Sequence, residues 1–282
     1  MTSITFVGIG AIGLPMAAQL VQAGHCVAGV DPMPAASGRA AALGISVVSA
    51  ITDAARAEIV IAMVATPDQL DTLVTQAGVD VMGQTWVIMS TVGPESVVAQ
   101  AARLTAAGAR VADAPVTGGV ARATTGELVI FLSGDRSTVA VVTPVLESLG
   151  TVRVVGSRVG DGQRVKVVNQ HLCSVHIVAA AEALSLAASL GLDQAKVLDL
   201  IGGGAAGSWM LADRGPRMLQ GDAPVTSSVN IFVKDSGLVA SAAAASGADV
   251  PLLIVAQARY AEAAAAGLGQ RDDSQVIATY RR

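Results

Sequence analysis

The hydrophobic pattern divides the chain into two parts. From Thr2 to about Val155, short runs rich in Val and Ile alternate with longer Ala-rich stretches, which predicts strands alternating with helices. Because the short runs are continuously apolar, we expect strands covered on both faces, as in a parallel sheet between helices. The predicted strands are Ile4–Val7, Cys26–Val30, Ile59–Met63, Trp86–Met89, Arg110–Ala112, Leu128–Leu132 and Val152–Val155.

Apolar residues at helical spacing fill the stretches between these strands. The predicted helices of the first part are Leu14–Gln22, Pro67–Thr75, Glu95–Ala106 and Ser137–Leu149. After Gly156 the strand candidates nearly vanish, and long segments rich in Ala and Leu take over. We therefore predict an α/β fold, with an N-terminal Rossmann domain built on a doubly wound, mostly parallel sheet over residues 1–160. An all-helical domain over residues 161–282 is expected to follow.

A long helix is predicted to join the two domains. The segment Gln163–Leu190 would form a helix of ~28 residues, ~42 Å long, which is too long for one compact layer. Further helices are expected at Gln194–Ile201, Ile231–Ser246 and Pro251–Ala266. The most apolar long window contains His176 and Glu182, so it predicts a buried or half-buried helix and no membrane partner.

Composition and charge narrow the class of protein. The chain is 52% apolar but only 2% aromatic, and this apolar content excludes a disordered chain. Its net charge is −4 and it has no run of basic residues, so a nucleic-acid partner is not expected. Cys26 and Cys173 lie far apart, which argues against a disulfide framework or a metal site. The N-terminus lacks the pattern of a secretory signal, and we expect a cytoplasmic protein.

The segment Gly8–Gly13 has the sequence GIGAIG, which fits the G-x-G-x-x-G pattern of dinucleotide-binding folds. It follows an apolar strand, opens a helix, and precedes a second strand ending in Asp31, eighteen residues beyond Gly13. Gly8 permits a tight turn, Gly10 lets a pyrophosphate approach the backbone, and Gly13 lets helix and strand pack closely. The backbone at Ala11 and Ile12 then belongs to the helix N-terminus, which offers N–H groups to the diphosphate.

Asp31 bears on the choice of cofactor. Its carboxylate can accept both ribose hydroxyls of the adenosine half and would repel a 2′-phosphate. Pro32 follows it and Arg39 is the nearest cation, so we expect NAD, with NADP less favoured. Loops at the ends of later strands are expected to line the nicotinamide half, through Val64, Ala65, Thr66 and Thr91. The alternative is that the two threonines only cap helices or turns.

Three further segments are polar against an apolar background: Asp113–Gly119, Gly160–Gln170 and Phe232–Asp235. Tandem glycines in the first can present backbone N–H groups to an anion. In the second, Lys166 and Asn169 are three residues apart on a predicted helix and so share a face.

Together these motifs resemble the β-hydroxyacid dehydrogenase family, in its 3-hydroxyisobutyrate dehydrogenase group, along essentially the whole chain. Gly8–Gly13 resembles the family's cofactor loop, and DAPVTGG at 113–119 resembles its substrate-binding DAPVSGG. Residues 160–169 resemble its catalytic G-x-G-x-x-x-K-x-x-N, and Lys234 with Asp235 resembles its C-terminal cofactor and substrate contact.

The resemblance implies roles for individual residues. Lys166 would be the catalytic lysine, and Thr117, Gly118 and Gly119 would hold the substrate carboxylate. Asn169 would orient substrate oxygens as part of the catalytic set. The remaining implied contacts are Gln170 with substrate, Lys234 at the nicotinamide end, and Thr91 at the family's nicotinamide-side Ser/Thr position. Two departures stand out: Thr117 replaces the usual Ser, and Arg164 occupies a place where small residues are common, where it either binds an anion or faces solvent.

The oxidation of an alcohol by a nicotinamide cofactor requires a proton acceptor, whatever the family. When an alcohol is oxidised, hydride moves to the nicotinamide C4 and the hydroxyl proton must leave as the carbonyl forms. A lysine that is partly desolvated beside a cationic nicotinamide can have a lowered pKa and act as general base, or as acid in the reverse direction. Lys166 is the candidate, and the alternative is a solvated helix lysine.

Within the family, the segments Gly207–Met210, Asp213–Leu219 and Ile231–Asp235 are most similar to the L-threonate dehydrogenase branch. A polyhydroxy acid would need several hydrogen-bond donors, which Asn169, Gln170, His171 and Ser208 could supply, although the histidine is more commonly a plain helix residue. Arg214 and Arg217 are expected to neutralise helix ends or pair with Asp213 and Asp222.

Three readings of function are therefore open. The leading one is an NAD-dependent dehydrogenase of a small hydroxy acid such as L-threonate, assembled as a homodimer or homotetramer. A second keeps the fold but acts as a 3-hydroxyisobutyrate dehydrogenase or reduces an aldehyde acid of the tartronate semialdehyde type; imine reductases of this shape generally lack the lysine. A third is a non-catalytic dinucleotide sensor, which would bind NAD without turnover.

Overall fold

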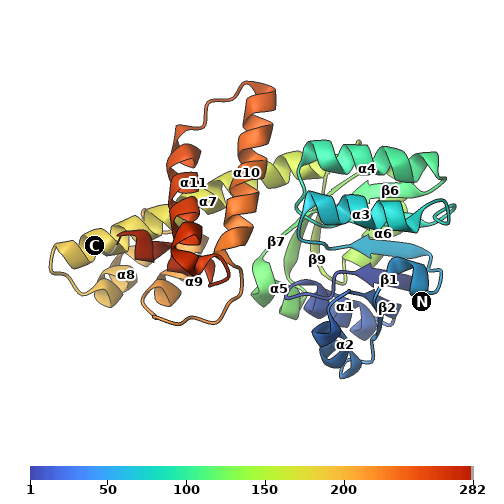
Figure 1. Cartoon of the computed structure of the whole chain (residues 1–282), viewed down its shortest axis with the longest axis horizontal. Coiled ribbons are helices and arrows are strands. Elements are labelled where there is room, and N and C mark those ends of the chain that lie inside the picture. The colour runs from blue at the N-terminus through green and yellow to red at the C-terminus, as the bar shows by residue number, and fades with distance from the viewer. Residues whose placement is uncertain (281–282) are drawn as a thin grey trace. The chain divides into compact units, whose positions relative to one another are not determined.

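The computed structural model describes residues 1–280 and divides the chain into two compact units, residues 1–166 and residues 167–282. The first unit holds every strand in the described part of the chain, together with the helices that cover the sheet (Figure 1). The second unit is helical. This architecture confirms the predicted fold class of a Rossmann domain followed by an all-helical domain.

The sheet of the first unit has the strand order β3-β2-β1-β4-β5-β6-β8-β7, and β9 pairs with β8. From β3 to β6 all neighbours are parallel, while β8 runs antiparallel to β6 and β7. The order β3-β2-β1-β4-β5-β6 is that of dinucleotide-binding sheets, with its topological switch between β1 and β4. The strand bounds are β1 Ser3–Val7, β2 Cys26–Val30, β3 Ser46–Val48, β4 Ile59–Ala62, β5 Thr85–Ile88, β6 Arg110–Asp113, β7 Val116–Thr117, β8 Leu128–Ser133 and β9 Gly150–Gly156.

Two apolar cores lie on the two faces of this sheet. One contains buried residues of α1, α2, α5 and α6, and the other contains buried residues of α3 and α4. All residues of β4 and β5 are buried, as expected for strands covered on both faces. The helix bounds are α1 Gly13–Gln22, α2 Pro34–Ala41, α3 Pro67–Ala77, α4 Pro94–Ala106, α5 Gly119–Thr125 and α6 Arg136–Leu146.

The second unit packs around α7, a helix of 29 residues that begins in the first unit. Its core includes Ile177, Ala181 and Leu184 from α7, with Phe232 stacked on Tyr260 at 5.3 Å between ring centroids. The helices are α7 Asp161–Ser189, α8 Gln194–Gly202, α9 Trp209–Met218, α10 Val229–Ser246 and α11 Pro251–Ala263, with a final 3₁₀ segment at Asp273–Tyr280.

Among the described residues, α7 is the one helix long and apolar enough to cross a membrane by length and composition alone. Core helices of globular domains meet the same criterion. Because Ile177, Ala181 and Leu184 on this helix are buried in the core of the second unit, we interpret α7 as a core helix.

Several helices and strands were not predicted from the sequence pattern. Two strands, β3 and β7, are only three and two residues long, and α2 and α5 are short helices with little apolar periodicity. Helix α9, which contains Gly215 and Pro216, was not predicted either. The expectation that every strand is covered on both faces is wrong for β9, where Val154 is 61% exposed.

Candidate active site and cofactor-binding loops

The glycine-rich turn after β1 is shaped by close backbone contacts. Gly8 has φ of +95°, and its N–H donates to the Val30 carbonyl at 2.8 Å. A Cβ at Gly8 would lie 2.3 Å from Met63 O, and one at Gly13 would lie 1.8 Å from Gly8 O. A Cβ at Gly10 would meet nothing within 4 Å. The turn is therefore closed on its inner side and open at its middle glycine, where a phosphate group can approach the backbone.

Asp31 follows β2 and faces this turn. Its Oδ2 accepts a hydrogen bond from Ile9 N and its Oδ1 accepts one from Met33 N, both at 2.9 Å. Each carboxylate oxygen has further acceptor capacity, so the half-buried side chain can also accept from two ribose hydroxyls. At the start of α1, Ile12 makes no side-chain cap, which leaves the helix N-terminus available to an anion. These features fit a dinucleotide.

The loops after β4 and β5 are joined by Ser90. Its Oγ accepts from Val64 N at 2.7 Å and donates to Ala62 O at 3.2 Å. Thr66 Oγ1 accepts from Gln69 N at 3.2 Å and so caps α3, which is the role that the alternative interpretation gave it. Ala65 is exposed beside it, and Thr91 is half-buried in the loop after β5.

The segment 113–119 runs from the end of β6 through β7 into α5. Thr117, the last residue of β7, pairs with Val129 of β8. Gly118 and Gly119 have φ of +130° and +65°, and all three residues of the Thr-Gly-Gly sequence are half-buried. A Cβ at Gly119 would meet nothing within 4 Å, so the backbone of Gly119 borders open space, as an anion-binding turn requires. A Cβ at Gly118 would lie 2.8 Å from the side chain of Arg122.

Asp113 has no exposed surface, yet it accepts hydrogen bonds from several donors. Its Oδ2 accepts from Gly160 N at 3.1 Å and Gln163 N at 2.9 Å, and more distantly from Ser133 Oγ at 3.4 Å. Its Oδ1 accepts from Gln163 Nε2 at 2.9 Å. Burial raises the pKa of Asp113 from 3.8 to about 6, because the desolvation of the carboxylate outweighs these hydrogen bonds.

Lys166 lies near the start of α7 and is only 6% exposed. Arg164, two residues earlier, points to a different environment: its guanidinium pairs with Asp161 at 2.6 Å and its side chain is 59% exposed. Of the two possibilities for Arg164, the structure therefore favours a residue that faces solvent.

In the second unit, three predicted site residues are linked around Asp235. Gln170 Nε2 donates to Asp235 Oδ2 at 2.5 Å, and Lys234 Nζ forms an ion pair with Asp235 Oδ1 at 2.8 Å. Asn169 Nδ2 donates to Gln170 Oε1 at 2.8 Å and to Cys173 Sγ at 3.3 Å. Asp235 itself is buried, so it fixes the side chains of its two direct partners.

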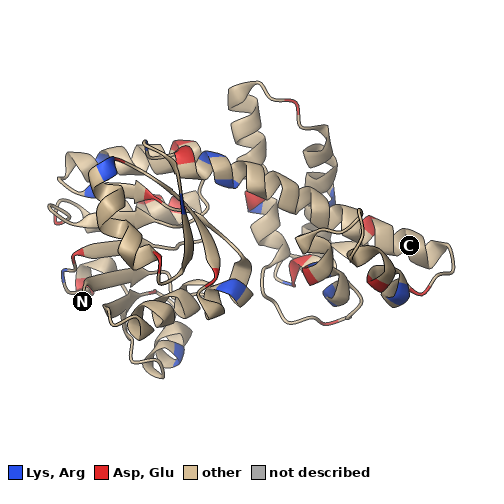
Figure 2. Cartoon of the chain, turned by 180° about the vertical axis from the view of Figure 1, so that it is seen from behind, with Lys and Arg blue, Asp and Glu red and all other residues tan. Residues whose placement is uncertain are grey.

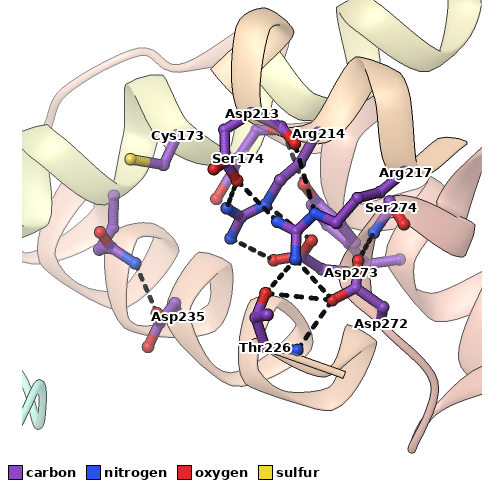
Figure 3. A network of polar contacts seen from close by, with 12 residues as sticks. Cys173, Ser174, Asp213, Arg214, Arg217, Thr226, Asp235, Asp272, Asp273 and Ser274 are labelled. Atoms are coloured by element: carbon purple, nitrogen blue, oxygen red, sulfur yellow. Dashed lines mark hydrogen bonds and ion pairs between the residues drawn. The ribbon is translucent and has the colours of Figure 1, made fainter. Parts of the chain in front are cut away.

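A second buried network ties α9 to the C-terminal segment (Figure 3). Arg214 Nε and Nη2 donate to the two oxygens of Asp273 at 2.9 and 2.8 Å, and Arg214 also pairs with Asp213. Arg217 pairs with Asp213 at 2.7 Å and with Asp272 at 3.0 Å. Burial alone would lower the pKa of Arg214, but the charge of Asp273 raises it. The predicted pairing with Asp213 is correct, whereas Asp222 pairs with Arg271 instead.

Acidic and basic residues are scattered over both units (Figure 2). Among residues 1–280, no group of three or more His, Cys, Asp or Glu side chains forms a candidate metal site.

Residues 3–160 match the family described as the NAD-binding domain of 6-phosphogluconate dehydrogenase. Residues 160–280 match the family described as NAD-binding of NADP-dependent 3-hydroxyisobutyrate dehydrogenase. The two matches adjoin at residue 160 and span nearly the whole chain. The chain belongs to the β-hydroxyacid dehydrogenase family.

This dehydrogenase is similar to named relatives along its length. It is 36% identical over 281 residues to L-threonate dehydrogenase of Cupriavidus necator, covering 98% of this chain and 95% of that protein. The crystal structure of 3-hydroxyisobutyrate dehydrogenase from Salmonella typhimurium matches with a TM-score of 0.93 at 32% identity, covering 99% and 100% of the two chains. Mycobacterium tuberculosis 3-hydroxyisobutyrate dehydrogenase with L-serine matches at 0.86 and 34% identity, over 100% of both chains.

Three residues of the dehydrogenase were not predicted as site residues although their motifs were noticed: Asp113, Gln163 and Asp235. Each is buried and hydrogen-bonded within one of the three polar segments that the sequence singled out. The available signal was the polarity of these segments in a chain that is only 14% charged. A buried polar residue of this kind needs a partner, which the linear sequence does not identify.

Proposed function

We propose that this dehydrogenase oxidises a small hydroxy acid of the L-threonate type, with NAD as acceptor and Lys166 as the general acid/base. The observation that carries the proposal is the burial of Lys166, at 6% exposure. Lysine is almost never buried without a specific role or partner, and desolvation is a common means of tuning a catalytic lysine. The chain has only three lysines.

The residues around the glycine-rich turn would hold the cofactor. Gly10, Ala11, Ile12 and Gly13 would face the diphosphate, and Asp31 would accept the ribose hydroxyls. When bound, NAD supplies a hydride acceptor at the nicotinamide C4. A carboxylate at Asp31 disfavours a 2′-phosphate, which supports NAD, although one matched family is described as NADP-dependent. Initial rates with each cofactor at equal concentration test this preference.

In the proposed reaction, Lys166 Nζ takes the proton from the substrate hydroxyl as the carbonyl forms. Thr117, Gly118 and Gly119 would hold the substrate carboxylate through the hydroxyl and backbone N–H groups. Asn169 and Gln170 would orient the remaining substrate oxygens. Lys234, whose charge is balanced by Asp235, would reach the substrate and the nicotinamide end.

A second candidate substrate, 3-hydroxyisobutyrate, is favoured by the Salmonella typhimurium structure of that name, which matches nearly the whole chain. NADH production from L-threonate, D-glycerate and 3-hydroxyisobutyrate, with tartronate semialdehyde in the reducing direction, separates the candidates. The proposal predicts the highest kcat/KM with L-threonate. A higher value with 3-hydroxyisobutyrate would contradict it.

We further propose that the protein forms a homodimer or homotetramer through its second unit and acts in the cytoplasm. Helix α8 buries none of its nine residues, and Leu200 on it is 78% exposed. On α11, Leu252 and Ile254 are 63% and 64% exposed. Exposed apolar residues on several helices of one unit support an interface between copies of the chain.

A further inference from the structure

The side chain of Gln163 makes four hydrogen bonds in the interior of the first unit. Its Oε1 accepts from Val92 N and from Gly93 N, both at 3.1 Å. Its Nε2 donates to Ser90 O and to Asp113 Oδ1, both at 2.9 Å. A primary amide has two donor hydrogens and two principal acceptor sites, so every position is used and the amide has one orientation. The side chain has no exposed surface.

The first turn of α7 is held by side chains that are distant in sequence. Asp113 Oδ2 accepts from Gly160 N and Gln163 N, and Ser133 Oγ accepts from Gly162 N at 2.9 Å. These acceptors lie at the ends of β6 and β8, so they replace the local N-cap residue that most helices use. The negative charge of Asp113 is also favourable at a helix N-terminus.

Gln163 therefore connects two segments that the proposed reaction requires. Its backbone belongs to the turn of α7 that precedes Lys166, which follows three residues later, or ~4.5 Å along the helix axis. Its amide binds both sides of Thr91, at Ser90 O and Val92 N. The loop expected at the nicotinamide and the helix bearing the proposed base are thus fixed to each other through one side chain.

We propose that Gln163 is a positioning residue, which with Asp113 sets the placement of Lys166 relative to the loop that carries Thr91. This inference rests on the proposed role of Lys166 as general acid/base. Proton transfer needs heavy atoms within hydrogen-bond reach, and a displacement of ~1 Å can cost ~100-fold in rate. Loss of the amide should consequently reduce kcat more than it changes the KM for NAD.

Gln163→Met tests the proposal, because methionine keeps the length and removes all four hydrogen bonds. We expect kcat to fall roughly 10- to 100-fold, with the KM for NAD within about threefold of wild type. Gln84→Met is the matched control. Gln84 is also buried, and its amide binds Ala57 O at 3.0 Å and Trp86 Nε1 at 3.3 Å, but it directly precedes β5 and so lies at the amino ends of the parallel strands, away from the loop that carries Thr91.

The control separates positioning from stability. Both variants lose buried hydrogen bonds and should lower Tm, but Gln84→Met should leave kcat unchanged. If Gln163→Met lowers Tm and its kcat stays close to that of Gln84→Met, Gln163 is only a stabilising residue and the inference is wrong.

A second variant does not depend on Gln163→Met folding. Asp113→Asn keeps one oxygen for Gly160 N and Gln163 N, but its NH₂ group would face Gln163 Nε2, so the contact between the two side chains is lost. We expect its kcat to lie about fivefold or more below that of Gln84→Met, with the KM for NAD within about threefold of wild type. A kcat equal to that of Gln84→Met would contradict the inference.

Lys166 can also be observed without turnover. Because the chain has only three lysines, reductive methylation with ¹³C-formaldehyde gives few NMR signals to assign. We expect the chemical shift of the Lys166 signal to change in Gln163→Met, because the surroundings of the side chain are displaced, and to stay constant in Gln84→Met. An unmoved Lys166 signal in Gln163→Met would contradict the inference.

Lys166→Ala distinguishes failure of this inference from failure of the proposed function. If Lys166→Ala retains turnover, the proposed role of the lysine is wrong. If Lys166→Ala is inactive while Gln163→Met has the kcat of Gln84→Met, the lysine assignment stands and the positioning role of Gln163 fails alone.

Discussion

Two aspartates illustrate how local environment decides the behaviour of a single residue. Asp113 is fully buried, and its pKa is raised to about 6 because desolvation exceeds the effect of its hydrogen bonds. Asp135 caps α6, and hydrogen bonds from Ser137 and Thr138 lower its pKa to about 2. Asp113 directly follows a predicted strand and Asp135 lies three residues after Leu132, the end of another, so the sequence alone could not tell their environments apart.

The raised pKa of Asp113 makes folding stability depend on pH. The folded state holds this proton more tightly than the unfolded state, so the contribution to stability is complete below pH 3.8 and is lost as the pH rises through about 6. The difference between the two pKa values corresponds to a change of ~3 kcal/mol in the free energy of unfolding over this pH range. In urea unfolding, we expect wild type to lose about this much between pH 4 and pH 7 relative to Asp113→Asn.

Asp135→Asn is the control, because its effect has the opposite sign and lies at lower pH. The lowered pKa of Asp135 stabilises the fold above pH 3.8 and ceases to do so as the pH falls through about 2. Parallel stability curves for wild type and Asp113→Asn from pH 4 to pH 7 would refute the burial argument.

Asp31 gives a prediction about cofactor choice. Removing its carboxylate in Asp31→Ala removes the proposed ribose contact and the repulsion of a 2′-phosphate, so the ratio of kcat/KM for NAD over NADP should fall about 10-fold or more. The ratio is the correct readout because Asp31 also accepts from Ile9 N, and loss of that bond weakens the binding of both cofactors. An unchanged ratio would show that the ribose contact is elsewhere.

At the scale of elements, strands with continuous apolar runs and helices with clear periodicity were predictable. For β2, the predicted bounds Cys26–Val30 are the observed ones. The elements that escaped prediction depend on tertiary contacts. The two-residue strand β7 is defined by its pairing with β8. The N-terminus of α7 is capped by Asp113 at the end of β6 and Ser133 at the end of β8. Residues that cap a helix from a distance carry no signal in the local sequence.

The buried ion pairs of α9 are expected to contribute to the stability of the fold. Arg214 is 8% exposed and Asp273 is fully buried, so Arg214→Met leaves a buried carboxylate without its partner. We expect a loss of about 3–5 kcal/mol in the free energy of unfolding, much of it recovered in Arg214→Met/Asp273→Asn. Arg103→Met, which removes an exposed pair with Asp71, should cost no more than about 1 kcal/mol. Equal losses from both single variants would contradict the role of burial.

At the scale of the whole molecule, the scarcity of aromatic residues means that cofactor and substrate would be recognised mainly by backbone groups and a few polar side chains. Only 2% of residues are aromatic, so few rings can stack on adenine or substrate. The glycine-rich turn, Asp31 and the polar residues of α7 and α10 are correspondingly the parts that the sequence proposes for recognition. The contacts of Gln163 and Asp235 required the fold, because Gln163 binds Asp113 at 50 positions away and Asp235 binds Gln170 at 65 positions away.

The proposed assembly is tested by the mass in solution. Size-exclusion chromatography with light scattering should give twice or four times the 28.1 kDa of the chain. Ile254→Glu places a charge on an apolar helix face and should shift the protein towards monomer. Leu43→Glu, on an exposed leucine of the first unit, is the control and should leave the mass unchanged. A wild-type monomer would contradict the proposed homo-oligomer.

The central claim is that Lys166 transfers the proton during hydroxy-acid oxidation. The most direct test measures kcat with L-threonate and NAD affinity by calorimetry for Lys166→Ala, beside Lys196→Ala at an exposed lysine of α8. We predict that Lys166→Ala lowers kcat about 100-fold or more with NAD affinity nearly unchanged, and that Lys196→Ala resembles wild type. Turnover by Lys166→Ala at the wild-type rate would contradict the account.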